Sequence, residues 1–295
     1  MAKPAQTPLN FGGIEPPFSS KDTSKISVLP VPYDLTTTYV AGTKNGPHAI
    51  LEASTHMELY DEELGKETYQ AGIYTHQPIP VTDKKPDDML HMVSKKVASE
   101  MKPDTLMVTL GGEHSITLGI VRELVKLYPD LSVLQLDAHA DLRETYEGTP
   151  YNHACVGRRI SELCPLVQAG VRSMSKEGAD FQRSSKVTTI SDYEIKDNQN
   201  ILKNAINALT DHVYLTIDLD VLDPAIMPSV GTPEPGGLNW METIQFLKLL
   251  SVRKQIVSFD VVELCPQEGN IAPDFLAAKL IYRLMGYIAV SREWI

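Results

Sequence analysis

The chain reads Val133-Leu134-Gln135-Leu136-Asp137-Ala138-His139-Ala140-Asp141 near its centre. A mostly apolar run is followed there by three side chains that can bind a metal ion. Because side chains alternate between the two faces of a strand, residues 137, 139 and 141 point the same way for as long as the backbone stays extended. The stretch therefore predicts a buried strand whose carboxyl end presents metal ligands.

Two further strand ends carry side chains of the same kind. Asp218-Leu219-Asp220 follows the run Val213-Tyr214-Leu215-Thr216-Ile217, and His114 closes a short segment after the run 106–109. A single acid at a strand end is commonly a turn residue or a helix cap. Three clusters together supply two histidines and four carboxylates, which are enough for two divalent ions that share oxygen ligands. Such a pair of ions is typical of a hydrolytic site.

Short apolar runs alternate with helical patterns over most of the chain. We expect strands at 26–31, 71–74, 105–110, 131–136, 166–171, 187–190, 212–217 and 255–262. We expect helices at 47–63, 86–101, 115–128, 155–164, 175–184, 197–209, 239–251 and 271–286. Continuous apolar strands separated by helices are typical of a parallel sheet covered on both faces, although about eight strands also suffice to close a barrel. In either arrangement the ligand site lies at the carboxyl ends of the strands, where the three clusters occur.

The length of 295 residues suits one large α/β domain or two small ones. We find no internal repeat, low-complexity segment or Gly/Ser linker, so we expect a single domain over residues 26–295. Residues 1–25 are rich in proline and are expected to form an irregular arm. The loops 142–154 and 223–238 each leave a cluster, and we expect them to build the substrate pocket.

Composition disfavours several classes of protein. The net charge of -11 argues against nucleic acid or an anionic membrane as the main partner and is compatible with a cationic substrate. The first 20 residues lack the apolar centre of a signal peptide, and no window reaches the ~18 apolar residues of a membrane span. Cys155, Cys164 and Cys265 show no C-x-x-C spacing, which argues against a disulfide framework and suits a reducing cytoplasm. We therefore expect a cytoplasmic protein.

The candidate ligands are rich in oxygen and include no thiolate. Such a set suits Mn²⁺ or a similar octahedral ion better than a structural zinc site. His153, on the loop past Asp141, is either a proton shuttle or an ordinary polar loop residue, since a histidine takes and returns a proton near neutral pH. Glu263 follows the run 257–262 and is either a carboxylate opposite a cationic substrate or a helix cap or surface acid.

At these residues the chain resembles the ureohydrolase (arginase/agmatinase) family. The matching segments occur in the family's order: Gly111–Ser115, Asp137–Asp141, Asn152-His153, Asp218–Pro224, Gly231–Leu238 and Glu263. Two upstream segments, 32–34 and 42–47, also resemble the family, so the likeness covers nearly the whole chain. The resemblance implies a three-layer α/β/α fold with a mostly parallel sheet of about eight strands.

The resemblance also implies a site and a reaction. Six ligands would hold two manganese ions per chain: His114 and Asp141 on one, His139 and Asp220 on the other, with Asp137 and Asp218 bridging them. His153 would be the proton shuttle, and Glu263 would hold the guanidinium of the substrate. The implied reaction hydrolyses a guanidino group to urea and an amine, in an enzyme that forms trimers or hexamers.

Within the family, residues 141–148 look like the agmatinase branch. Agmatine, whose hydrolysis gives putrescine for polyamine biosynthesis, is the expected substrate; aminopropylagmatine, guanidinobutyrate and guanidine are substrates in the same branch. Arg143 would favour a carboxylate-bearing tail if it faced the pocket. We expect it instead to pair with Glu144 or Glu147 or to face outward.

Two other functions are compatible with part of the pattern. A metal-dependent amide deacetylase on a related fold would use one D-x-H and one further Asp around a single ion. The additional ligands Asp141, Asp220 and His114 favour two ions over one. A non-catalytic binding protein is a third reading, and the intact ligand set argues against it.

Overall fold

A central β-sheet organises the structure, a computed structural model that describes residues 9–295. Its strands are β1 (Ile26–Val31), β4 (Ile73–Thr75), β5 (Leu106–Gly111), β6 (Ser132–Leu136), β7 (Leu166–Val171), β8 (Thr188–Ser191), β9 (His212–Asp218) and β10 (Gln255–Val262). They lie in the order β4-β1-β5-β10-β9-β6-β7-β8, and every neighbouring pair is parallel. A separate antiparallel hairpin pairs β2 (Tyr60–Asp61) with β3 (Lys66–Glu67).

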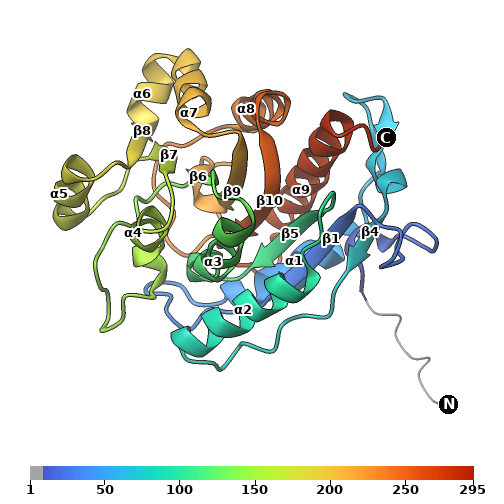
Figure 1. The fold of residues 1–295 in the computed structure, drawn as a ribbon, viewed down its shortest axis with the longest axis horizontal. Helices are drawn as coiled ribbons and strands as arrows, with labels where there is room; N and C mark the ends of the chain where they lie inside the picture. Colours follow the sequence, from blue (N-terminus) through green and yellow to red (C-terminus); the bar gives the residue numbers. More distant parts are fainter. Residues whose placement is uncertain (1–8) are drawn as a thin grey trace.

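Helices cover both faces of the sheet, which gives the molecule three layers (Figure 1). The α-helices are α1 (Gly46–Ser54), α2 (Pro86–Glu100), α3 (Thr117–Leu127), α4 (Val156–Ser161), α5 (Lys176–Ser184), α6 (Asp192–Asp197), α7 (Leu202–Ala208), α8 (Trp240–Arg253) and α9 (Ala272–Ser291). Short 3-10 helices are η1 (Phe11–Gly13), η2 (Thr43–Asn45), η3 (Thr68–Ala71), η4 (His114–Ile116), η5 (His153–Cys155), η6 (Gln199–Ile201) and η7 (Leu219–Val221). The predicted α/β/α fold with a mostly parallel, eight-stranded sheet is confirmed.

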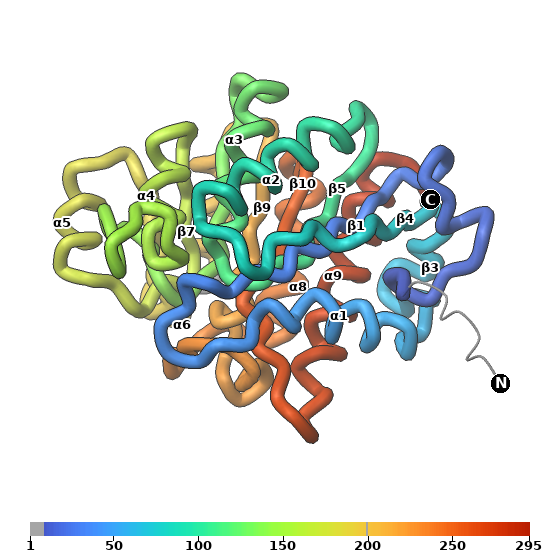
Figure 2. Tube along the Cα trace, turned by 90° about the horizontal axis from the view of Figure 1, so that it is seen from below, coloured from blue at the N-terminus to red at the C-terminus, as the bar shows by residue number. Residues whose placement is uncertain are grey.

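The two faces of the sheet form two separate apolar cores. Ile26 and Val28 of β1 belong to the core that also contains residues of α1, α7, α8 and α9, whereas Leu29 and Val31 belong to the core that contains residues of α2, α3 and α4. Figure 2 shows α1, α8 and α9 on one side of the strands and α2 and α3 on the other. Because both faces are buried, most positions of the central strands are apolar, which is why these strands read as largely apolar runs; the edge strand β8 (Thr188–Ser191) is mostly polar.

All eight expected strands are present, with ends within two residues of the predicted ones. The alternative of a closed barrel is wrong, because β4 and β8 are free edges of an open sheet. In the part of the chain that the structure describes, no helix is both long and apolar enough to cross a bilayer.

The helix expected at 47–63 is wrong in its second half. Helix α1 ends at Ser54, and the chain then enters the β2–β3 hairpin. The buried guanidinium of Arg283 on α9 contacts three consecutive acids of this hairpin, at 3.0 Å from Asp61, 2.5 Å from Glu62 and 3.2 Å from Glu63. This long-range ion-pair cluster holds a hairpin where local helical spacing favoured a helix, as tertiary context often does.

The region around 197–209 also differs from the prediction. It contains η6 and the short helix α7, while α6 begins earlier, after Ser191. Ser191 and Glu194 form a reciprocal capping box at the start of α6. The sequence contains the S-x-x-E pattern that is typical of such a helix start. That pattern indicates α6, whereas the spacing of apolar residues does not.

Part of the expected arm of residues 1–25 lies outside the described residues. Within residues 9–25, Phe11 is buried, and its ring lies 6.5 Å from that of Tyr282 on α9. This segment is therefore packed on the body of the protein. The boundary between an arm and a domain at residue 25 stays a prediction.

The four strands β5, β10, β9 and β6 are neighbours in the centre of the sheet. Because they are parallel, their carboxyl ends meet at one edge, and the three ligand clusters and Glu263 all leave from that edge. Strand β5 ends in close contact with the segment after β1: a Cβ atom on Gly112 would lie 1.9 Å from the carbonyl oxygen of Tyr33. Only glycine permits this approach.

Candidate active site

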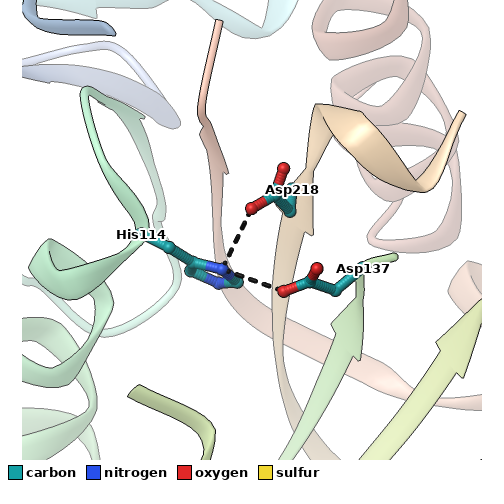
Figure 3. Close-up of side chains that lie close together, drawn as sticks. All are labelled: His114, Asp137 and Asp218. Carbon is teal, nitrogen blue, oxygen red and sulfur yellow. Dashed lines mark ion pairs between the residues drawn. The ribbon is translucent and has the colours of Figure 1, made fainter. Parts of the chain in front are cut away.

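Three side chains from separate strand ends converge on one point (Figure 3). The Nδ1 atom of His114 lies 3.1 Å from an oxygen of Asp137 and 3.2 Å from an oxygen of Asp218. An oxygen of Asp141 lies 3.4 Å from the same nitrogen. His114, Asp137 and Asp218 are buried, so this group of ligand atoms is shielded from bulk water.

A second group shares one member with the first. The Nδ1 atom of His139 lies 2.8 Å from Asp220 Oδ2 and 3.7 Å from Asp137 Oδ1. Asp137 thus faces His114 with one oxygen and His139 with the other. In each group, three ligand-capable atoms lie within 4.8 Å of one another. The structure brings together all six predicted ligands, and their individual roles stay predictions.

The backbone that presents these ligands is not the extended strand that the alternation argument assumed. Asp141 has a left-handed φ of 52°, and Asp220 sits inside the 3-10 helix η7. Glu263 likewise has a φ of 65°. A left-handed conformation costs a non-glycine residue about 1–3 kcal/mol, and such strain concentrates at functional sites. Strand alternation therefore explains why Asp137 and Asp218 lie at this edge but not how Asp141 and Asp220 turn inward.

Polar residues of the strands fix two of the ligands. The amide of Gln135 donates to Asp137 at 2.7 Å, and Nε2 of His114 lies 2.8 Å from the hydroxyl oxygen of Thr216. The second contact leaves Nδ1 of His114 to face the carboxylates. Gln135 and Thr216 each precede an aspartate ligand by two residues on the same face of a strand. That spacing was a signal in the sequence, but neither residue was predicted.

Burial and mutual repulsion govern the charges of the carboxylates. Burial and the charge of Asp137 raise the pKa of Asp141 to about 6, and burial together with Asp220 and Asp137 raises the pKa of Asp218. Burial also opposes ionisation of Asp137, but hydrogen bonds with His114 and His139 outweigh it and lower its pKa. Several buried acids at this spacing are stable as anions only beside additional positive charge.

Two divalent cations fit this arrangement. Nδ1 of His114 is buried and has no hydrogen-bond partner among the described residues, although three carboxylates surround it. An imidazole nitrogen and carboxylate oxygens are the ligands that octahedral divalent ions of the manganese type accept. Because the two groups meet at Asp137, a pair of ions would share that carboxylate.

His153 and Glu263 lie beside the two groups and belong to neither. His153 Nδ1 is 3.9 Å from Glu263 Oε1, and both residues line one cavity of about 160 Å³. Burial lowers the pKa of His153 to about 4, so its ring is neutral at pH 7. Burial, followed by the charge of Glu113, raises the pKa of Glu263, whose oxygen accepts the backbone N–H of His114 at 2.7 Å.

Loop residues form the outer wall of the same cavity. Thr38, Arg143, Tyr146 and Thr232 line it together with four of the candidate ligands, His139, Asp141, Asp218 and Asp220. The expectation that Arg143 faces outward or pairs with an acid is wrong. Its guanidinium carbon lies 4.7 Å from the centre of the Tyr146 ring, and Glu144 instead contacts Arg158 at 3.3 Å.

Comparisons with known proteins agree with the geometry. The model of the arginase family matches residues 24–286. The chain is 42% identical to the N(1)-aminopropylagmatine ureohydrolase of Synechocystis sp., over 91% of this chain and 90% of that protein. It is 34% identical to the agmatinase of Pyrococcus horikoshii, over 93% and 95%. Its fold is similar to the crystal structure of agmatine ureohydrolase of Thermoplasma volcanium, with a TM-score of 0.83, 31% identity and coverage of 98% and 96%.

Proposed function

This chain belongs to the arginase family of ureohydrolases, and from that premise we propose that it hydrolyses a guanidino polyamine to urea and an amine. Agmatine, which would give putrescine for polyamine biosynthesis, and its N1-aminopropyl derivative are the proposed substrates. The observation that carries the proposal is the pair of histidine–carboxylate groups joined at Asp137, with His153 and Glu263 on the same cavity.

We propose that two Mn²⁺ ions occupy the two groups. His114, Asp137, Asp141 and Asp218 surround one position, and Asp137, His139 and Asp220 surround the other. When bound, such ions make nearby water acidic enough to serve as the nucleophile at neutral pH. Asp137 would contribute to both ions, as its two oxygens face opposite histidines. The bridging role of Asp218 rests on the family resemblance.

Glu263 would bind the reacting end of the substrate. A guanidinium is protonated at any working pH and presents a planar fork of N–H donors, which a carboxylate accepts in pairs. The left-handed backbone of Glu263 aims its carboxylate into the cavity beside His114. A paired contact fixes the plane of the guanidinium, and it thereby orients the carbon that water attacks.

His153 would move the proton that the reaction requires. Attack of water on the guanidinium carbon and loss of the amine break one C–N bond and form one C=O bond. The departing nitrogen takes up, one after the other, both protons that the attacking water loses, so the amine leaves as an ammonium ion and the urea is neutral. A neutral His153 at the cavity wall can accept a proton from the water and donate it to the departing amine.

A second candidate substrate class has one observation in its favour. Arg143 is one of the residues that line the cavity, and its guanidinium forms no ion pair among residues 9–295. Such a group can bind a carboxylate, as in guanidinobutyrate. We favour a polyamine tail because the similar proteins of Synechocystis sp. and Pyrococcus horikoshii are named for aminopropylagmatine and agmatine.

The test is a side-by-side measurement of urea release with Mn²⁺ from agmatine, N1-aminopropylagmatine, guanidinobutyrate, arginine and guanidine. We expect the highest kcat/KM for one of the first two. A preference for guanidinobutyrate would replace the proposed tail and leave the reaction class standing. Release of acetate from an acetylated amine without any urea would favour the deacetylase alternative instead.

We also propose that the enzyme works as a cytoplasmic homo-oligomer. Its three cysteines are free thiols, which suits a reducing compartment. A trimer or hexamer is implied by the family resemblance, and light scattering of the purified protein would measure the mass directly.

A further inference from the structure

Thr36 connects two parts of the site that lie far apart in the sequence. It belongs to the segment 34–42, which follows β1, and its side chain is buried. Its N–H and its hydroxyl donate to the two oxygens of Glu113 at 2.6 and 2.5 Å. Its hydroxyl oxygen accepts the backbone N–H of His153 at 3.2 Å, and its carbonyl accepts the amide of Asn152 at 3.3 Å. All the polar atoms of Thr36 are therefore engaged.

Glu113 is a fixed anchor for this contact. It is fully buried, directly precedes His114, and also accepts the hydroxyl of Ser115. Its backbone N–H donates to the carbonyl of Tyr33 at 2.7 Å, which ties the end of β5 to the segment that carries Thr36. A carboxylate with three donors and no exposure holds those donors in place.

The backbone of His153 is held from a second side. Asn152 accepts the N–H of Ala154 at 2.9 Å and so caps the 3-10 helix η5 in which His153 is the first residue. Its other side-chain atom donates to Thr36. The ring of His153 then lies with Nδ1 3.9 Å from Glu263 and Nε2 3.4 Å from the hydroxyl of Thr38. Thr36 itself does not line the cavity.

We propose that Thr36, anchored on Glu113, is a positioning residue that sets the place of His153 relative to the end of β5. This inference rests on the proposed role of His153 as the proton shuttle. Glu113 directly precedes the candidate metal ligand His114, and Thr36 accepts one hydrogen bond from the backbone of His153. The contact therefore fixes the separation between the proton carrier and the nucleophile's site, and a shift of about 1 Å there can cost ~10²-fold in rate.

Thr36→Val tests the inference because it removes the hydroxyl and keeps the shape of the side chain. We expect kcat for the best substrate to fall by about 10-fold to 100-fold, with KM and bound manganese unchanged. Thr36→Ser retains the hydroxyl and should stay within about threefold of wild type. Thr37→Val, at the neighbouring position, is the matched control and should behave like wild type, since the Thr37 hydroxyl has no hydrogen bond within residues 9–295 except the one that it donates to the carbonyl of Asp34.

A double-mutant cycle separates positioning from a general structural effect. If Thr36 acts through His153, Thr36→Val should cause no further loss of kcat in a His153→Ala background. Full additivity of the two substitutions would overturn the inference. So would a fully active Thr36→Val variant in a protein that His153→Ala inactivates. A fully active His153→Ala variant would overturn the shuttle role and, with it, the role of Thr36.

Asn152→Ser provides a second route if Thr36→Val does not fold. Serine can still cap η5, but it lacks the amide that donates to Thr36. We expect a smaller fall in kcat that is again absent in the His153→Ala background. A fall that persists undiminished in that background would contradict the inference.

Discussion

The candidate ligands and the outer wall of the cavity are held in different ways. The ligands leave the carboxyl ends of neighbouring strands, and most are buried and fixed by strand residues such as Gln135 and Thr216. The outer wall comes from loops, where Arg143 and Tyr146 are only partly buried and the guanidinium of Arg143 lies over the ring of Tyr146. A rigid sheet thus carries the groups that every substrate of this reaction requires, whereas the loops carry the groups that meet the variable tail.

The second loop, 223–238, is tied to the candidate ligands by polar contacts. The guanidinium of Arg172 donates to the carbonyl of Asp220 at 2.7 Å and to that of Glu234 at 3.1 Å. The carboxylate of Glu234 in turn lies 3.6 Å from Nε2 of His139. This loop therefore belongs partly to the ligand region. In the first loop Asn152 and His153 are held by Thr36, so Arg143 and Tyr146 are the stronger candidates for selecting the tail.

The comparison predicts that loss of the shared ligand has the largest effect. Asp137→Asn should remove at least one ion and reduce urea formation from every substrate to the level of the metal-free protein, because both groups use this carboxylate. Metal analysis and kinetics on the same preparation provide the test. Asp87→Asn, on the exposed first turn of α2, is the control. Two ions per chain with normal turnover in Asp137→Asn would break the assignment.

Loss of the charge on Glu263 should be nearly as severe but should leave the metals bound. Glu263→Gln preserves the size of the side chain and removes the anion that faces the guanidinium. We expect kcat/KM to fall by a factor that corresponds to a loss of about 2–5 kcal/mol of transition-state binding, the scale for breaking a buried charge pair. Steady-state kinetics with agmatine would measure it. An equal loss of manganese would show that Glu263 acts through the ions and not on the substrate.

Metal removal should destabilise the ligand region in a pH-dependent way. In the metal-free protein, burial and neighbouring acids raise the pKa of Asp141 to about 6, from an ordinary value near 3.8. An acid whose pKa is raised in the folded protein makes its full contribution to the free energy of unfolding at a pH below its pKa in the unfolded chain. That contribution is lost as the pH rises through its pKa in the folded protein. Added Mn²⁺ should therefore raise the melting temperature more at pH 8 than at pH 5. A smaller rise in melting temperature on adding Mn²⁺ at pH 8 than at pH 5 would contradict this electrostatic explanation.

The smallest effect is expected in the loop. Arg143→Gln should leave metal content unchanged and shift relative kcat/KM between agmatine and guanidinobutyrate by only a few-fold, because Arg143 is partly exposed and solvent screens its charge. The shift should favour agmatine, whose tail is cationic. Equal losses for both substrates would show that Arg143 supports the site and does not select the tail.

The difference between strand-end ligands and loop residues also explains which parts of the site could be predicted from the sequence. Strand ends with clustered Asp and His residues are visible because apolar runs and their terminations are local patterns, and six ligand positions followed from them. The left-handed turn at Asp141 and the 3-10 turn at Asp220 do not follow from strand alternation, and Asp220 accepts the backbone N–H of Ala138, which lies 82 residues away in the sequence. Thr36 lies 77 residues from Glu113 and 117 from His153. No local pattern connects those three, and Arg143 could not be placed before the loop was seen.

We propose that two ions joined at Asp137 serve the hydrolysis of a guanidino group. The decisive experiment is to titrate metal-free protein with Mn²⁺ while recording urea formation and the electron paramagnetic resonance spectrum. We predict that full activity requires two equivalents of Mn²⁺ per chain and coincides with the signal of a spin-coupled manganese pair. Full urea-forming activity at one equivalent, with only the signal of an isolated ion, would contradict the account.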